Sequence, residues 1–210
     1  GKRSHVKGFL DDYAYVVQAC TVLYQVTFDE YWINRARALT HHTVEHFYDA
    51  QDGFFQYSPR DGEKLIASRK EIFDNVIPAS NSVMAQNLFH HGIFFDDRAW
   101  TDLGKNMAFS LSHLITSEPN YMSNWGIAYM EMKKGMAEVA IVGDEAATVA
   151  HELFSNFQPF ALGMGGERES ILPLPEGKTA VDGKTTIYVC YNKTCQRPVH
   201  ESAEAVKQLI

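Results

Sequence analysis

The chain has 210 residues, 45% hydrophobic and 12% aromatic, enough to bury one sizeable core and too apolar to be disordered. Its net charge of −7 argues against a nucleic-acid surface, because duplex phosphates demand clustered lysine and arginine. No apolar run approaches the roughly 18 residues of a membrane span, and the first residues do not form a signal peptide. We expect a cytoplasmic chain without a membrane anchor, cut from a longer protein because it opens on Gly1.

Two helices are predicted at the start. Apolar residues recur every three or four positions from Leu10 to Tyr24, the spacing of a helix that buries one face. Thr27 and Glu30 have the spacing of a capping box, and the same periodicity then continues to Phe47. Turn-forming residues at 49–53 end this second helix.

The middle of the chain alternates between irregular and helical patterns. Between Gly53 and Asn75 aromatic residues flank a turn, which predicts a β-hairpin or ordered loop with strands near 53–57 and 64–66. The helical pattern returns after Pro78, breaks around 92–97 and resumes through Leu114. A fifth helix is predicted after Pro119.

The last third of the chain has a different character. A β-branched run at 138–142, a helical stretch through Leu153 and a second apolar run at 160–163 predict a strand-helix-strand unit. A strand at 186–190 and a short helix from Ser202 follow. We therefore divide the chain into a helical-hairpin portion, residues 1–135, and an appendage with a cysteine-bearing tail, residues 136–210.

Helical hairpins joined by short loops favour side-by-side stacking, because one amphipathic pair cannot bury both of its faces. The expected fold is mainly α, part of an (α/α)6 toroid with a small α/β appendage at the C-terminal end. Six hairpins of this size need roughly twice the present length by the arithmetic of repeat arrays. The chain is therefore expected to be half of a ring.

Several segments resemble a known family. The inter-helix stretch from Asp52 to Asn75 is similar to those of the N-acylglucosamine 2-epimerase and six-hairpin glycosidase group. The chain as a whole resembles the C-terminal region of the thioredoxin-domain-containing, spermatogenesis-associated protein family, through the segments 8–14 (GFLDDYA), 74–82 (DNVIPASNS), 139–144 (VAIVGD) and 189–199 (VCYNKTCQRPV). One departure is Ala79-Ser80-Asn81, where the family commonly has Ser-Gly-Asn. The resemblance implies an upstream thioredoxin-like domain and a remaining barrel half in the full-length protein.

Polar residues at the first helix are the first site candidates. Asp11, Asp12 and Tyr13 stand where carboxylates gain from the helix dipole and from unpaired backbone N–H groups, so capping is one interpretation. The other is a cavity-lining role, since inner helices of such barrels point their N-terminal ends at the central cavity. We assign Asp11 and Asp12 as catalytic candidates, Tyr13 as a substrate-binding one, and add His5, just before this segment, as a catalytic candidate.

A second polar cluster precedes the helix that follows Pro78. Asp74, Asn75, Ser80, Asn81 and Ser82 offer donors and acceptors suited to sugar hydroxyls, although capping of the helix would also explain them. We assign Asp74 as a catalytic candidate and the other four as substrate-binding ones. The resulting hypothesis is a carbohydrate site with a carboxylate or histidine as general acid/base, for epimerisation or glycoside hydrolysis.

No cofactor or metal is expected. His42 and His46 have i, i+4 spacing, but no glutamate follows His42 as in H-E-x-x-H. The glycines at 163–166 lack the G-x-G-x-x-G spacing of a phosphate-binding loop and lead into charged residues rather than an apolar helix. Both are interpreted as structural.

Four residues separate Cys190 from Cys195, a wider spacing than that of C-x-x-C redox or zinc motifs. They are interpreted as structural thiols, as a disulfide if their Cα atoms approach within about 7 Å, as redox-active thiols or, as the least favoured alternative, as metal ligands. The alternative function is therefore a non-catalytic docking module that serves the thioredoxin-like redox domain implied by the resemblance.

Overall fold

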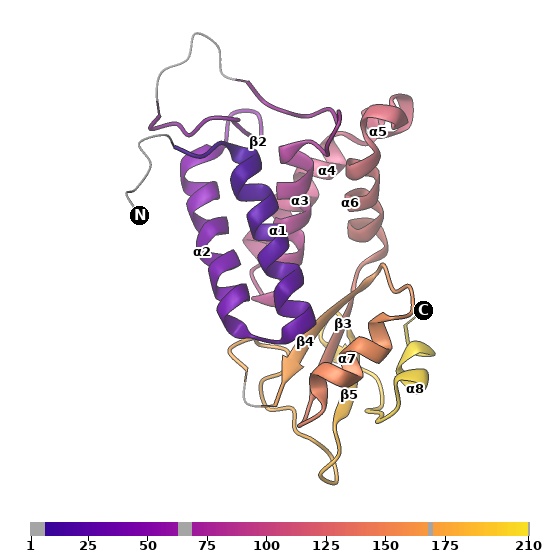
Figure 1. Cartoon of the computed structure of the whole chain (residues 1–210). Coiled ribbons are helices and arrows are strands. Elements are labelled where there is room, and N and C mark those ends of the chain that lie inside the picture. Colours follow the sequence, from indigo (N-terminus) through magenta and orange to yellow (C-terminus); the bar gives the residue numbers. More distant parts are fainter. Residues whose placement is uncertain (1–6, 63–68, 168–169, 210) are drawn as a thin grey trace.

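The computed structural model describes residues 7–62, 69–167 and 170–209. The chain is mainly α-helical, with a bundle of helices in its first two thirds and a small sheet below it (Figure 1). The buried apolar residues form one cluster that runs from Leu10 to Ala205. No helix within the described ranges is both long and apolar enough to cross a bilayer.

The first two predicted helices are confirmed, as α1 (Leu10–Thr27) and α2 (Glu30–Phe47). The predicted capping box is wrong. Thr27 is the last residue of α1, and the N-cap of α2 is Asp29, whose carboxylate accepts a hydrogen bond of 2.9 Å from the Tyr31 backbone N–H. Phe28 between them has φ 53°, a left-handed conformation that ends α1 and reverses the chain.

A two-stranded antiparallel hairpin follows α2 earlier than predicted. Its strands are β1 (Tyr48–Asp49) and β2 (Phe54–Phe55), with Gly53 at φ 82° leading into β2. The prediction placed the turn after the aromatic run, whereas the structure pairs Phe55 with the residue that immediately follows α2. The second predicted strand, at 64–66, lies outside the described residues.

The middle of the bundle is α3 (Ser80–Phe94), which is buried on nearly every side. It packs against α1, against α4 (Arg98–Ser110) and against α6 (Ser123–Lys134). Gly104 lets α4 approach closely, because a Cβ there would lie 2.6 Å from the Ala85 carbonyl oxygen. The helix predicted through Leu114 is divided at Leu111 into α4 and α5 (Ser112–Ser117), and a 3-10 turn, Pro119–Tyr121, leads into α6.

A buried histidine joins three of these helices. The imidazole of His91 on α3 is 2.8 Å from the Thr21 hydroxyl on α1 and 3.0 Å from the Thr40 hydroxyl on α2. Because the Thr21 hydroxyl donates to the Val17 carbonyl, it accepts from Nε2–H of His91, and the Thr40 hydroxyl donates to Nδ1. Burial lowers the pKa of His91 to about 3. The ring is therefore a neutral structural element of the core.

The strand-helix-strand unit is confirmed as β3 (Ala137–Val142), α7 (Ala146–Phe154) and β4 (Ala161–Gly166), with β3 and β4 parallel. Two further strands complete a sheet of order β4-β3-β5-β6: β5 (Thr186–Tyr191), antiparallel to β3, and β6 (Thr194–Cys195), antiparallel to β5. The closing helix is α8 (Ser202–Val206). β6 was not predicted, because a two-residue strand has no periodicity to detect.

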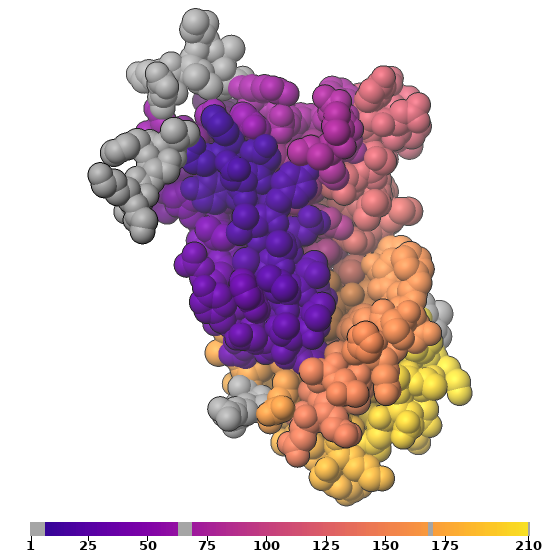
Figure 2. Space-filling view, viewed as in Figure 1, coloured from indigo at the N-terminus to yellow at the C-terminus, as the bar shows by residue number. Residues whose placement is uncertain are grey.

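The sheet is attached to the C-terminal end of α1. Side chains of this end accept hydrogen bonds from the outer edge of β4, the Gln25 carbonyl from Gly163 N–H (3.0 Å) and the Tyr24 hydroxyl from Gly165 N–H (3.3 Å). Figure 2 shows the segment of α7 and β4 packed closely against the lower part of α1. An otherwise open sheet edge is thereby covered.

Candidate functional site

The candidate site lies at the end of the bundle where α1, α3 and α6 begin (Figure 1). The segment 69–79 passes over this end and borders an open cavity of about 500 Å³. The lining includes carboxylates, one guanidinium, an amide and a phenol, contributed by Asp11, Arg69, Glu71, Asp74, Asn75 and Tyr121. Three helix N-termini with their free N–H groups explain why carboxylates collect here.

Asp74 connects the covering segment to two helices. One carboxylate oxygen accepts from the Ala79 N–H (2.8 Å), at the N-cap of α3. The other accepts from the Asn124 N–H (2.9 Å) and the Ser123 hydroxyl (3.3 Å), in the first turn of α6. With only 8% of its surface exposed, Asp74 is a cap shared by α3 and α6.

Asp11 and Glu71 are the other two carboxylates of the cavity. Asp11 accepts from the Tyr57 hydroxyl (3.2 Å) and from the Asp12 N–H (3.0 Å). Glu71 lies 3.1 Å from the Arg69 guanidinium and accepts from the Ser80 hydroxyl at 3.2 Å. These contacts hold both carboxylates at the cavity while leaving oxygen lone pairs for a ligand.

The pKa values of two tyrosines near the cavity are raised, in part by its carboxylates. Burial raises the pKa of Tyr15, and the negative charges of Asp11, Asp74 and Glu71 raise it further. Its hydroxyl donates to the Pro78 carbonyl at 2.7 Å. The pKa of Tyr57 is raised by burial and by Asp11. Both phenols therefore remain protonated donors beside the cavity, to the Pro78 carbonyl and the Asp11 carboxylate. The carboxylates on the cavity wall favour a ligand with hydroxyl or cationic groups.

The structure brings together three of the predicted site residues, Asp11, Asp74 and Asn75, on the wall of one cavity. Asp12 does not line it. Its carboxylate accepts from the Phe9 N–H at 2.9 Å, one turn back along the chain, which is the capping geometry considered in the sequence. His5 lies outside the described residues.

The other predicted binding residues are built into the surrounding framework. The Asn81 amide accepts from the Phe55 N–H (2.8 Å) and donates to the Phe55 carbonyl (3.0 Å), so it attaches β2 to α3. The Ser82 hydroxyl donates to the Ala79 carbonyl and accepts from the Asn124 amide, both at 2.8 Å. The Tyr13 ring packs on α2, with its centroid 5.2 Å from that of Phe47. Ser80 reaches the cavity only through Glu71.

Sequence reasoning missed Arg69, Glu71, Tyr15 and Tyr57. Glu71 belongs to the inter-helix segment 52–75, on which the family resemblance partly rests, so that resemblance could have identified it as a site candidate. Tyr15 is separated from Pro78 by 63 positions in the chain. Only the packing of α1 beside α3 brings these two residues together, and helical periodicity carries no information about that pairing.

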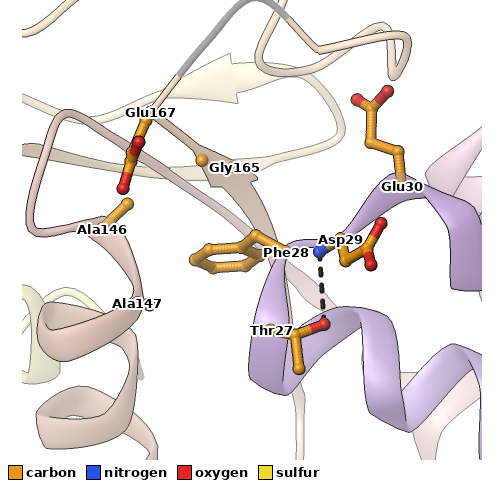
Figure 3. A pocket seen from close by; sticks show the side chains of 9 residues that line it. Thr27, Phe28, Asp29, Glu30, Ala146, Ala147, Gly165 and Glu167 are labelled. Atoms are coloured by element: carbon orange, nitrogen blue, oxygen red, sulfur yellow. Dashed lines mark hydrogen bonds between the residues drawn. The ribbon is translucent and has the colours of Figure 1, made fainter.

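A second cavity, of about 470 Å³, lies between the α1–α2 turn, the start of α7 and the carboxyl end of β4 (Figure 3). Parallel strand ends beside a helix N-terminus can bind phosphates. Here Asp29, Glu30 and Glu167 line the wall, and their negative charges disfavour an anion. The glycine run at 163–166 belongs to β4 rather than to a loop before a helix.

Cys190 and Cys195 form a disulfide, with an S–S distance of 2.07 Å and a Cα–Cα distance of 3.8 Å. Of the interpretations left open, the structure has the bonded pair, joined across β5 and β6. The remaining cysteine, Cys20, is free and buried. Across the described ranges, no group of three or more histidine, cysteine or acidic side chains is placed to hold a metal ion.

No protein-family model matches the chain. It is similar in sequence to several longer proteins. It is 25% identical to human spermatogenesis-associated protein 20 over 213 aligned residues, which cover 96% of this chain and 27% of that protein. The mouse protein of the same name is 24% identical with the same coverage. An uncharacterized protein of Caenorhabditis elegans is 22% identical over 92% of the chain. The chain thus spans about a quarter of the length of these relatives.

Proposed function

We propose that the cavity at the start of α1, α3 and α6 binds carbohydrate and serves an epimerase- or glycosidase-like reaction. The observation that carries the proposal is the convergence of Asp11, Glu71 and Asp74 with Arg69 on a cavity of about 500 Å³. Sugar hydroxyls are recognised by such sets of carboxylate, guanidinium and phenol groups at fixed positions. The volume suits a mono- or disaccharide.

The contacts divide the carboxylates by role. Both oxygens of Asp74 already accept backbone or hydroxyl hydrogen bonds, so its part is to hold the two helix starts and the covering segment in place. Asp11 is our first choice for general acid/base, because it is less buried and carries a Tyr57 hydroxyl as its partner. Glu71 is the second carboxylate that such chemistry requires.

Exposed aromatic rings support a sugar rather than a small anion. Phe73 and Tyr121, both on the cavity wall, leave 52% and 57% of their surface exposed. Flat apolar rings of this kind pack against the C–H faces of sugar rings, while polar groups bind the hydroxyls. An anion would gain nothing from these two rings.

The same proposal includes a larger helical barrel of which this chain is one part. α1 leaves a row of apolar side chains in water: Val16 (49% exposed), Leu23 (39%) and Val26 (66%) lie seven and three positions apart, on one helix face. A continuous apolar row on a helix favours a covering partner. Further helices of the longer protein would supply it, with the sugar cavity at the mouth of the ring.

The second candidate function is a non-catalytic docking module for a thioredoxin-like domain elsewhere in the longer protein. The same α1 row favours this candidate, because a domain that docks there would cover the apolar side chains without any use of the cavity. The two candidates differ in whether Asp11 and Glu71 affect sugar binding.

The test is a calorimetric and NMR screen of the full-length protein with neutral mono- and disaccharides. We expect binding that Asp11→Asn and Glu71→Gln each weaken by about tenfold or more, the loss expected for one charged hydrogen bond. Asp102→Asn is the matched control, because Asp102 is exposed on α4 and does not line the cavity. If no sugar binds, or if the three variants bind alike, the carbohydrate proposal is wrong and the docking module is favoured.

A further inference from the structure

One row of side chains crosses three strands of the sheet. In the antiparallel register Glu138 on β3 lies opposite Cys190 on β5, and Cys190 lies opposite Cys195 on β6. Directly opposed residues of antiparallel strands point to the same face, with Cβ atoms about 5 Å apart. The side chains of Glu138 and Cys190 therefore lie next to each other on one face of the sheet.

The two cysteine residues differ in their exposure to solvent. Cys190 is fully buried, whereas Cys195 is exposed in the short edge strand β6. The turn between them is made by Asn192 and Lys193, whose φ values of 49° and 65° form a tight two-residue hairpin. The Lys193 N–H donates to Glu138 Oε1 at 3.2 Å, so the carboxyl group is held beneath the hairpin tip.

We propose that the Cys190–Cys195 disulfide is a reversible thiol–disulfide exchange site, in which a dithiol attacks Cys195 Sγ and Glu138 transfers the proton of Cys190. The site is independent of the proposed carbohydrate cavity, which lies at the far end of α1. Its partner is defined by chemistry as a dithiol that can reach an exposed strand edge.

The exchange has two steps. A thiolate of the dithiol attacks Cys195 Sγ, a mixed disulfide forms, and the Cys190–Cys195 bond breaks with its electron pair on Cys190 Sγ. The Glu138 carboxylic acid protonates this buried thiolate. The second thiol of the partner, as thiolate, then attacks the partner's own sulfur and releases Cys195, which takes a proton from water. Glu138 is reprotonated from the solvent, which took up the two protons of the dithiol, so the net transfer to the two cysteines is two electrons and two protons.

The surroundings of Glu138 favour such a proton transfer. Only 8% of its surface is exposed, and burial raises the pKa of its carboxyl group above the ordinary value. The Lys193 N–H and the positive charges of Lys193 and Lys178 lower that pKa, and the negative charge of Asp96 raises it, but burial dominates. A carboxyl group that holds its proton to higher pH is a better donor to a thiolate formed in a buried position.

The direction of attack is tested with glutathione, a monothiol whose mixed disulfide with the protein is trapped by rapid alkylation before a second glutathione resolves it. The native chain is incubated with reduced glutathione, the free thiols are alkylated, and the modified peptides are mapped by mass spectrometry while circular dichroism follows the fold. We expect glutathione on Cys195 and the alkyl group on Cys190, with the fold retained. Glutathione on Cys190, or reduction only after unfolding, would overturn the proposal.

The role of Glu138 is tested by the rate of reduction with dithiothreitol, divided by the concentration of dithiothreitol thiolate, at a series of pH values that begins at the ordinary pKa of a glutamate. In the wild type we expect this rate to fall as pH rises through the pKa of Glu138. Glu138→Gln, which keeps an acceptor for the Lys193 N–H, is expected to be about tenfold slower at the low end and independent of pH. Glu138→Asp is expected to restore part of the pH dependence.

Asp102→Asn on α4 is the control and is expected to match the wild type. If Glu138→Gln does not fold, the pH profile of the wild type is sufficient to test the proton transfer. A purely structural role for Glu138 would produce no fall in the reduction rate divided by the thiolate concentration. A flat wild-type profile, or equal profiles for wild type and Glu138→Gln, would refute the proton transfer.

Discussion

Acid is expected to unfold this chain partly through His91. The imidazole is fully buried, accepts a hydrogen bond at Nδ1 from Thr40 and donates at Nε2 to Thr21. Protonation would place a second N–H against the Thr40 hydroxyl, which already donates to that nitrogen, and the described charges that act on the ring are the other histidines His90 and His41. Burial, aided by the nearby His90 and His41, therefore lowers the pKa to about 3 from the ordinary 6.5.

The direction and the size of this pH effect on stability follow from the difference in the His91 pKa between the folded and the unfolded chain. The unfolded chain takes up a proton at His91 near pH 6.5 while the folded chain does not, so stability is complete above that pH and is lost as the pH falls. At pH 5.0, about 1.5 units below the ordinary value, the loss is about 2 kcal/mol at roughly 1.4 kcal/mol per unit. A loss of this size is a large fraction of the stability of a typical domain.

The assay is urea unfolding at pH 7.5 and 5.0, followed by tryptophan fluorescence and circular dichroism. His91→Gln is the matched variant, since its amide keeps one donor and one acceptor for the two threonines but does not titrate. Other titrating groups, including His42, whose pKa is also lowered by burial, contribute to both proteins alike. We expect the wild type to lose about 2 kcal/mol more than His91→Gln between the two pH values. Equal losses would refute the assignment.

Two further predictions concern the framework of the cavity. Asp74→Ala removes the acceptor of the Ala79 and Asn124 N–H groups. We expect it to lower the free energy of unfolding by about 3 kcal/mol, whereas Asp102→Ala should lower it by less than about 0.5 kcal/mol. Similar losses for the two variants in urea titrations would show that the shared cap contributes little. Asn81→Ala removes the partners of the Phe55 backbone N–H and carbonyl groups and should lower the free energy of unfolding by about 2 to 3 kcal/mol. The Phe55 amide should then exchange its hydrogen faster. An unchanged exchange rate there would contradict the attachment of β2 to α3.

Much of the local structure could be predicted from the sequence. Helical periodicity located α1, α2, α3 and α6, and the β-branched run at 138–142 located β3, because burial of one face or of a whole strand leaves a pattern in neighbouring residues. Errors arose where that pattern is weak. The start of α2 depends on the left-handed turn at Phe28, and the hairpin register depends on which residue Phe55 faces.

For the candidate site, too, some features could be predicted from the sequence and others could not. The polar clusters at 11–13 and 74–82 were visible as residues, and so was their capping interpretation, because a helix start needs acceptors for its free N–H groups. Their partners were not visible. Asp74 caps α6 across 50 positions of chain, and the Glu138 carboxyl group accepts from the Lys193 N–H across 55.

The sequence by itself determined the mainly α character, the order of the elements and which residues carry chemistry, since these depend on periodicity and composition within a few turns of chain. Only the tertiary structure decided that Asp11, Glu71 and Asp74 share one cavity, that Asp12 and Asn81 serve the framework, and that Cys190 bonds to Cys195. The reason is physical: packing free energy depends on contacts between segments far apart in the chain, and neither the hydrophobic pattern of one helix nor that of one strand specifies its partner.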